Sequence, residues 1–272
     1  MKLFIINLKR SSERKVQMQE KLELLQQDPL FTELGLSYHF FSAIDSNSEE
    51  FKQCKAMFDS TLCYLLHGRI LIDSEIACYA SHYSLWGECV RLNEAIVVLE
   101  DDIAFEPNFL NALKDIMNTE FHFVKFFTSC RKRDKYIYQI DNSNYHYSLK
   151  NTNGTLGYFI TPKAAKALLA QTIWDSPVDI QMEFVSRHYI DNIIYKPFIV
   201  SEDIIAMQST IVNSDGSHRA NNGGGGAIPL HYKILKPFYR TYIQLKRAIF
   251  KLCYKPPHVV YKNVVQKNHK LI

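Results

Sequence analysis

Apolar positions in the first part of the chain follow two different spacings. Residues 2–8 are almost continuously apolar, which predicts a short buried strand. The run Ser11-Ser12-Glu13 is typical of a helix start, and apolar residues follow it at three- and four-residue steps. Residues 38–44 are aromatic and β-prone, which predicts a second strand. Strand, helix and strand in this order indicate a βαβ unit.

The middle of the chain continues this alternation. Residues 73–92 predict a helix, capped by Asp73 or Ser74, that is apolar on most sides and therefore packed inside. Residues 95–99 form a continuous apolar run, typical of a central parallel strand buried on both faces. Other segments are interpreted in the same way: short helices and a loop at 46–72, helices begun by Pro107, Pro162 and Pro177, strands at 121–128, 155–161 and 193–200, and a surface excursion at 130–150. The pattern predicts an α/β fold with a mostly parallel sheet.

Charge divides the chain into two parts. The total of +4 is small, but residues 1–215 hold all 28 acids against 21 Lys and Arg, a net charge of −7. Residues 216–272 hold 11 Lys and Arg and no acid. The hydrophobic content of 47% excludes a disordered chain, a collagen-like repeat and a coiled coil. An acidic folded body and a basic tail therefore need separate explanations.

Targeting signals and cysteine spacing indicate a compartment. The apolar run at the amino end is too short for a signal-peptide core. No stretch reaches the roughly 18 uninterrupted apolar residues of a membrane span. The six cysteines show neither a C-x-x-C pair nor metal-finger spacing. We therefore expect reduced thiols in a cytosolic protein.

Three consecutive acids, Glu100, Asp101 and Asp102, directly follow the strand at 95–99. Ligands of α/β proteins bind at the carboxyl ends of strands. Carboxylate oxygens there suit Mg²⁺ or Mn²⁺, ions that also bind ligand phosphates. The alternative is a solvated acidic turn. The triplet is thus a candidate metal site that does not by itself identify a reaction.

Several other segments carry candidate chemistry, each with a plainer alternative. Basic residues between 6 and 14 lie beside a helix amino terminus, which is either an anion site or an ordinary helix start. His82 lies in the buried helix, where a core role is the default, and Asp179 is by default a helix N-cap. His218 and Arg219, next to the glycine run at 223–226, supply a metal ligand and a phosphate cation, or simply a flexible surface.

Five segments in order resemble glycosyltransferase family 25, the bacterial lipooligosaccharide galactosyltransferases and their relatives. They are INLKRSSER (6–14), SEIACYASHYSLW (74–86), AIVVLEDD (95–102), GTLGYFITPKAAKALL (154–169) and PVDIQM (177–182). The resemblance implies a GT-A type fold over residues 1–226, a nucleotide-sugar donor and inversion at the anomeric carbon. Two departures are Asp73–Cys78, where the family usually shows Gly-Glu-Ile-Gly-Cys, and the loose stretch 209–219, where it tends to a Ser/Gly-rich run ending in Arg.

The resemblance and the candidate chemistry together assign roles to individual residues. For an inverting transfer, the expected general base is Asp179, with His82 as second choice. A divalent metal and fixed cations would stabilise the leaving diphosphate. The expected metal ligands are Glu100, Asp102 and His218. The expected donor-binding residues are Asn7, Arg10, Arg14, Ser81, Asp101 and Arg219.

Residues 227–272 form a basic tail with a predicted amphipathic helix. Pro237 is expected to begin the helix and Pro256-Pro257 to end it. Its apolar stripe consists of Phe238, Tyr242, Leu245, Ile249 and Leu252, and its basic face of Arg240, Arg247, Lys251 and Lys255. Such a helix suits an anionic bilayer surface. The alternative is a helix docked on the domain by its apolar stripe.

The expected function is therefore an inverting transferase. It would move galactose from UDP-galactose, with Mn²⁺ or Mg²⁺, onto a lipid-linked lipooligosaccharide or lipopolysaccharide acceptor at the inner face of a bacterial inner membrane. Alternatives are a glucosyl- or N-acetylhexosaminyltransferase, or an inactive relative that only binds glycans. Nucleic acid is not an expected partner, because the tail contains no known recognition motif.

Overall fold

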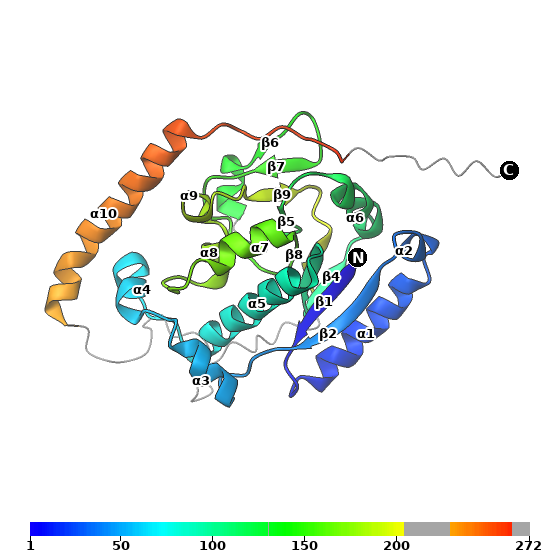
Figure 1. The fold of residues 1–272 in the computed structure, drawn as a ribbon, viewed down its shortest axis with the longest axis horizontal. Helices are drawn as coiled ribbons and strands as arrows, with labels where there is room; N and C mark the ends of the chain where they lie inside the picture. The colour runs from blue at the N-terminus through cyan, green and yellow to red at the C-terminus, as the bar shows by residue number, and fades with distance from the viewer. Residues whose placement is uncertain (130, 204–228, 263–272) are drawn as a thin grey trace.

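The computed structural model describes residues 1–129, 131–203 and 229–262 (Figure 1). The elements in chain order are β1 (Lys2–Asn7), α1 (Ser12–Gln26), α2 (Pro29–Glu33), β2 (Ser37–Ser42), α3 (Glu49–Lys55), α4 (Ser60–His67), α5 (Asp73–Leu92), β3 (Ile96–Glu100), β4 (Ile103–Phe105), α6 (Phe109–Asn118), β5 (Phe123–Lys125), the 3-10 helix η1 (Arg131–Tyr136), β6 (Tyr138–Gln139), β7 (Tyr145–Tyr147), β8 (Gly157–Ile160), α7 (Pro162–Leu169), α8 (Val178–Met182), α9 (Val185–His188), β9 (Ile193–Tyr195), β10 (Val200–Glu202) and α10 (Leu230–Cys253).

A mixed sheet with the strand order β2-β1-β3-β8-β5-β9-β7-β6 forms the centre of the protein. Strand β1 pairs in parallel with both β2 and β3, so the expected βαβ unit is confirmed. Strand β8 lies antiparallel between β3 and β5, and β7 lies antiparallel to β9 and β6. The other strands of this sheet all point the same way, which agrees with a largely parallel α/β sheet.

Helices cover both faces of the sheet, because alternate residues of each strand point to opposite sides. Val97 and Leu99 of β3 pack in one core with residues of α1 and α6, whereas Ile96 and Val98 pack in another with α5 and α7. All four side chains are fully buried. The prediction of a central strand buried on both faces is thus confirmed.

Three segments differ from the sequence expectations. Residues 193–200 are not one strand: β9 belongs to the central sheet, whereas β10 pairs with β4 in a separate ribbon. Residues 130–150 are not only a surface excursion, because β7 joins the sheet and buries Tyr145. Helix α5 is capped by Ile72, whose N–H donates to Glu75, rather than by Asp73 or Ser74.

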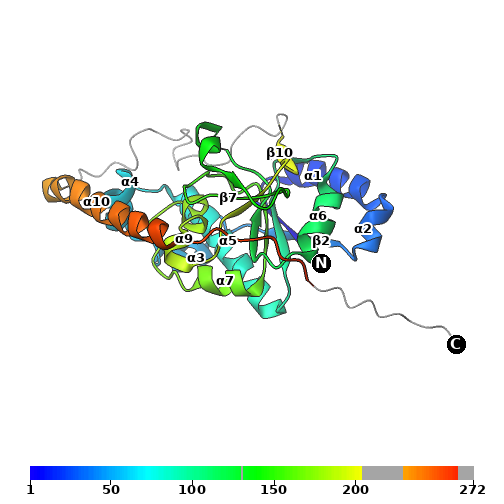
Figure 2. The same cartoon turned by 90° about the horizontal axis from the view of Figure 1, so that it is seen from above.

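The tail helix α10 begins at Leu230 and contains Pro237 in its interior, so Pro237 does not begin it. It lies along the outer edge of the molecule beside α4 and α9 (Figures 1 and 2). The side toward the domain is the one opposite the apolar stripe: the Arg247 guanidinium lies 4.7 Å from the centre of the Phe184 ring and donates to Asn151. The five stripe residues are 50–87% exposed. The alternative prediction, that this helix docks on the domain through its apolar stripe, is therefore wrong. None of the helices in the described part of the chain combines the length and the hydropathy of a membrane-spanning segment.

Candidate active site

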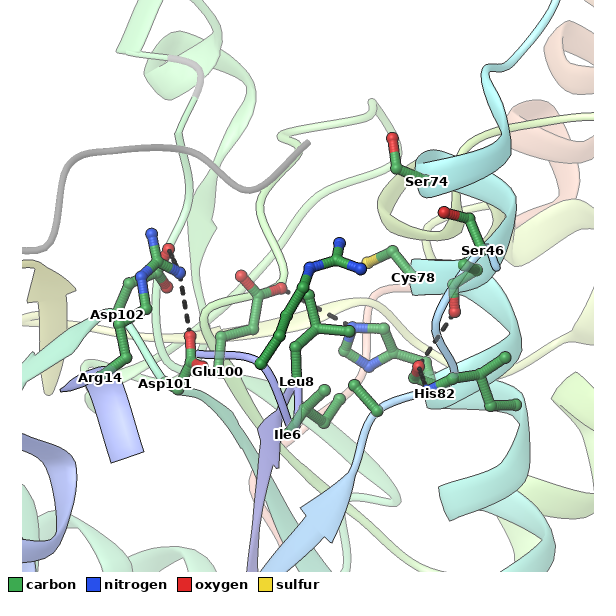
Figure 3. Close-up of a pocket in the computed structure, with 15 residues that line it drawn as sticks. Ile6, Leu8, Arg14, Ser46, Ser74, Cys78, His82, Glu100, Asp101 and Asp102 are labelled. Carbon is green, nitrogen blue, oxygen red and sulfur yellow. Dashed lines mark hydrogen bonds and ion pairs between the residues drawn. The ribbon is translucent and has the colours of Figure 1, made fainter. Parts of the chain in front are cut away.

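A pocket of about 120 Å³ opens at the carboxyl ends of β2, β1 and β3 (Figure 3). The three strands are parallel neighbours, so the residues that follow them reach the same edge of the sheet. Helix α5 forms the opposite wall. The lining residues are Ile6, Leu8, Arg10, Arg14, Ala43, Ile44, Ser46, Ser74, Ala77, Cys78, Ser81, His82, Glu100, Asp101 and Asp102. Small-molecule sites span roughly 300–1,000 Å³, so a nucleotide sugar would extend beyond this pocket.

Asp101 and Asp102 carry more negative charge than their surroundings offset. Burial raises the pKa of Asp101, although its carboxylate accepts from the Asn7 amide at 2.6 Å and from Arg14 at 3.0 Å. Burial and the Glu100 charge raise the pKa of Asp102 to about 7. Arg14 also contacts Asp102, at 3.4 Å, but Oδ1 of Asp102 is buried without a hydrogen-bond partner among the described residues. The arrangement therefore favours an added cation.

Glu100, the last residue of β3, faces the opposite wall of the pocket. Its carboxylate accepts from the Thr155 hydroxyl, and its Oε1 lies 3.6 Å from Nε2 of His82. Burial acts to raise the pKa of Glu100, but His82, Thr155 and Arg14 together lower it. Glu100 is thus the acid of the triplet that most readily stays ionised.

Two groups of residues could hold a metal ion. The carboxylate oxygens of Glu100 and Asp102 are of the type that Mg²⁺ and Mn²⁺ prefer, and Oδ1 of Asp102 has no partner among the described residues. Ligand atoms of Cys78, His82 and Glu100 also lie within 4.8 Å of one another. However, burial and nearby carboxylates raise the pKa of the Cys78 thiol well above its usual value, which opposes the thiolate that a metal needs. The carboxylate pair is the better fit. The predicted ligand His218 lies outside the described residues.

The predicted donor-binding residues lie in different surroundings. Arg10 and Arg14 line the pocket, where Arg10 pairs with Asp45. Ser81 also lines it, but its hydroxyl donates to the Ala77 carbonyl and accepts from the Ile44 N–H, both at 2.9 Å. The structure thus brings Arg10, Arg14 and Ser81 to one pocket, and their roles toward a donor stay predictions.

Of the other predicted donor-binding residues, Asn7 does not line the pocket, and Arg219 lies outside the described residues. Asn7 is buried behind the pocket, and its amide donates to Asp101 and to the Ser11 carbonyl. This arrangement orients an acid of the pocket. Arg219 and the glycine run at 223–226 lie outside the described residues.

Asp179 lies beside the pocket rather than among its lining residues. It is not the N-cap of α8, because that position is Pro177. Its carboxylate accepts from the Ile180 N–H at 2.8 Å and from the Gly154 N–H at 3.3 Å. Gly154 has a φ of +92°, a left-handed conformation that glycine adopts without strain. Thr155, the next residue, donates to Glu100. Adjacent residues therefore connect Asp179 with the acidic triplet.

Sequence reasoning missed an ion pair that supports this connection. Lys125 and Glu183 form a fully buried salt bridge. Glu183 also accepts from the Thr152 N–H at 2.6 Å and from the Asn153 N–H at 3.2 Å. A lysine within a predicted apolar strand was the only signal in the sequence, and it did not identify the partner. The pair fixes the segment that leads into Gly154 and Thr155.

Comparison with known proteins identifies the chain. An acidic and basic pocket at the carboxyl ends of parallel strands is typical of ligand-binding α/β proteins. The family model described as "Glycosyltransferase family 25 (LPS biosynthesis protein)" matches residues 1–182. The chain belongs to glycosyltransferase family 25, as the resemblance predicts.

Similar proteins of known sequence are animal members of the family. A "Glycosyltransferase 25 family member" of Anopheles gambiae is 32% identical over 180 residues, which cover 62% of this chain and 28% of the relative. "Procollagen galactosyltransferase 1" of Danio rerio is 31% identical over 119 residues, 42% of this chain and 18% of the relative. A "Probable inactive glycosyltransferase 25 family member 3" of Rattus norvegicus is 32% identical over 119 residues, 42% and 19% of the two chains. The chain thus spans less than a third of these relatives.

Proposed function

We propose that the protein is an inverting galactosyltransferase that uses UDP-galactose and a divalent cation held by Glu100 and Asp102. The observation that carries the proposal is the acidic triplet in the pocket, where the buried Oδ1 of Asp102 has no partner among the described residues. Galactose is the sugar that the names of the procollagen galactosyltransferase relatives support.

The residues of the pocket and Asp179 beside it would divide the chemistry of sugar transfer between them. A bound divalent cation would offset the negative charge of the leaving diphosphate. Arg10 and Arg14, which line the same pocket, add fixed positive charge. Asp179, half-buried on α8, would accept the proton of the acceptor hydroxyl. Its bonds from the backbone N–H groups of Gly154 and Ile180 hold the carboxylate in place for this step.

The proposed acceptor is a lipid-linked oligosaccharide at the cytoplasmic face of a membrane. The family description supports a lipopolysaccharide-type acceptor, and the exposed stripe of α10 supports a membrane location. The stripe lies on a segment without any acid, and the exposed Lys246 lies 4.6 Å over the ring of Tyr242 in the stripe. An anionic bilayer complements both the apolar stripe and the charge.

Donor-dependent release of UDP tests the proposed reaction. We expect purified full-length protein with UDP-galactose to release more UDP with Mn²⁺ than with a chelator, and more than with UDP-glucose or UDP-N-acetylglucosamine. Glu100→Gln should abolish this release. Glu49→Gln should not, because the Glu49 carboxylate is exposed and distant from Glu100 in the sequence. Equal release of UDP with Mn²⁺ and with chelator would refute a role for the metal. No release from any UDP-sugar would favour the inactive glycan-binding alternative.

Flotation with phosphatidylglycerol or phosphatidylcholine vesicles tests the proposed membrane surface. We expect the full chain to float with the anionic vesicles only, and Leu245→Glu to remain at the bottom. Leu24→Glu is the matched control, because Leu24 on α1 is 67% exposed and Leu245 is 59% exposed. Equal flotation of both variants, or a dimer that only Leu245→Glu dissociates, would refute the bilayer as the partner of the stripe.

A further inference from the structure

Three fully buried side chains form a chain of hydrogen bonds behind the pocket. The indole Nε1 of Trp86 lies 3.0 Å from the hydroxyl oxygen of Tyr158. The same oxygen lies 2.9 Å from Nδ1 of His82. Trp86 and His82 belong to α5, and Tyr158 belongs to β8, so the chain joins the helix to the central sheet. None of the three residues is exposed to solvent.

The direction of these hydrogen bonds follows from the hydrogens that each group carries. The indole nitrogen of Trp86 can only donate, so the Tyr158 oxygen accepts this bond. The single hydrogen of the Tyr158 hydroxyl then needs an acceptor, and Nδ1 of His82 is the one that the described residues provide. A hydrogen on Nδ1 would leave the tyrosine hydrogen buried without a partner, which costs the full desolvation of that group. Nδ1 therefore accepts.

The other ring nitrogen of His82 faces the pocket. Its Nε2 is buried, lies 3.6 Å from Oε1 of Glu100 and makes no hydrogen bond to another described residue. Figure 3 shows the His82 ring directed toward Glu100. Because Nδ1 is occupied by the tyrosine hydrogen, a neutral His82 carries its own hydrogen on Nε2.

We propose that Trp86 and Tyr158 hold His82 in the tautomer with the hydrogen on Nε2, so that this N–H is directed at the Glu100 carboxylate, 3.6 Å away. Trp86 and Tyr158 are then positioning residues. The Thr155 hydroxyl donates to the same carboxylate, so both groups place a hydrogen toward Glu100. This tautomer also leaves no lone pair on Nε2 for a metal in the Cys78, His82 and Glu100 cluster. The tautomer rests on the geometry alone, and its use in sugar transfer rests on the proposed function.

Nuclear magnetic resonance of the full chain with ¹⁵N-labelled histidine tests the tautomer directly. The His82 signals are assigned by their loss in His82→Gln. We expect a protonated Nε2 and an unprotonated Nδ1. The reverse tautomer, or a ring protonated on both nitrogens, would overturn the proposal, and the wild-type spectrum decides this without any variant at Tyr158.

Removal of the Tyr158 hydroxyl tests whether this group sets the tautomer of His82. In Tyr158→Phe, both ring nitrogens of His82 should shift toward the average of the two tautomers. Tyr145→Phe is the matched control, because Tyr145 is equally buried and its hydroxyl does not contact His82. Unchanged His82 signals in a folded Tyr158→Phe would show that another group sets the tautomer.

The rate of UDP release distinguishes a hydrogen-bond donor from a general base at His82. The amide nitrogen of glutamine can replace the Nε2–H donor but cannot act as a base. We expect His82→Gln to release UDP about tenfold faster than His82→Ala, because only glutamine keeps an N–H directed at Glu100. Equal loss in both variants would refute the donor role. If wild-type protein releases no UDP, the proposed function fails, while the tautomer is still decided by the spectra.

Discussion

Replacement of Asp102 by asparagine is expected to stabilise the metal-free fold while removing a ligand for the cation. In the folded protein, burial and the charge of Glu100 raise the pKa of the Asp102 carboxyl from 3.8 to about 7. The ionised carboxylate therefore destabilises the fold at neutral pH and above. Asparagine has similar size and no charge, so it removes this repulsion.

The magnitude follows from the shift of the pKa. A change of about three units corresponds to about 4 kcal/mol at 1.36 kcal/mol per unit. The Asp102 side chain is 30% exposed, and the asparagine variant also loses the attraction between the carboxylate and Arg14. Both effects reduce the gain, so we expect about 1–3 kcal/mol. For a domain of this size, each kcal/mol raises the melting temperature by about 2–4 °C.

The effect of Asp102 on the stability of the fold depends on pH. Below about pH 4, Asp102 is protonated in both the folded and the unfolded chain and contributes nothing. Between about pH 4 and about pH 7 the unfolded chain ionises while the folded chain holds the proton, so stability falls as pH rises. Above about pH 7 both states are ionised and the penalty is complete. Asp102→Asn should remove this decline.

Thermal unfolding with chelator, at about pH 5 and about pH 8, measures the effect. We expect Asp102→Asn to melt higher than wild type mainly at the higher pH, and Mn²⁺ to stabilise wild type more than the variant. Asp134→Asn, an exposed acid on η1, controls for the loss of one charge. A lower melting temperature of metal-free Asp102→Asn at about pH 8 would show that Arg14 already compensates the triplet, and would refute the reasoning.

Three further outcomes are expected. Asp179→Asn should lower UDP release with acceptor by about 10²–10⁴-fold and keep donor binding in calorimetry, as for loss of a general base; near-normal release would exclude this role. Lys125→Met should destabilise the fold by about 3–5 kcal/mol in urea unfolding, because Glu183 is left buried and charged; a loss below about 1 kcal/mol would show that Glu183 takes up a proton or water. Burial lowers the pKa of His67 to about 4, so stability should fall as pH drops from about 6.5 to about 4. His67→Gln should flatten this part of the pH profile, and an unchanged profile would exclude His67 as its source.

Local pattern was enough to predict the first half of the sheet and the pocket in it. The apolar run of β1, the helix start at Ser12 and the run of β3 all agree with the structure. The acidic triplet could be placed at a ligand-binding edge because parallel strands bring their carboxyl ends together. These inferences depend only on spacing within short segments and on one general rule of sheet topology.

The remaining features depend on pairings between distant residues. Strand β8 separates β3 from β5 in the sheet, and its apolar sequence does not reveal that it is antiparallel to both. Lys125 pairs with Glu183 only because the fold brings β5 and α8 together. The direction of the α10 stripe is likewise set by contacts such as Arg247 with Phe184, which periodicity alone cannot predict.

The segment from Thr152 to Thr155 shows why these distant pairings matter for the site. Glu183 fixes its beginning, Gly154 donates to Asp179, and Thr155 donates to Glu100. The expected base and an expected metal ligand are therefore oriented by consecutive backbone positions. Because their partners belong to one short segment, a shift of this segment would displace both carboxylates together. Substitution of Lys125 or Glu183 should therefore affect the expected base and the expected metal ligand together, although neither substituted residue lines the pocket.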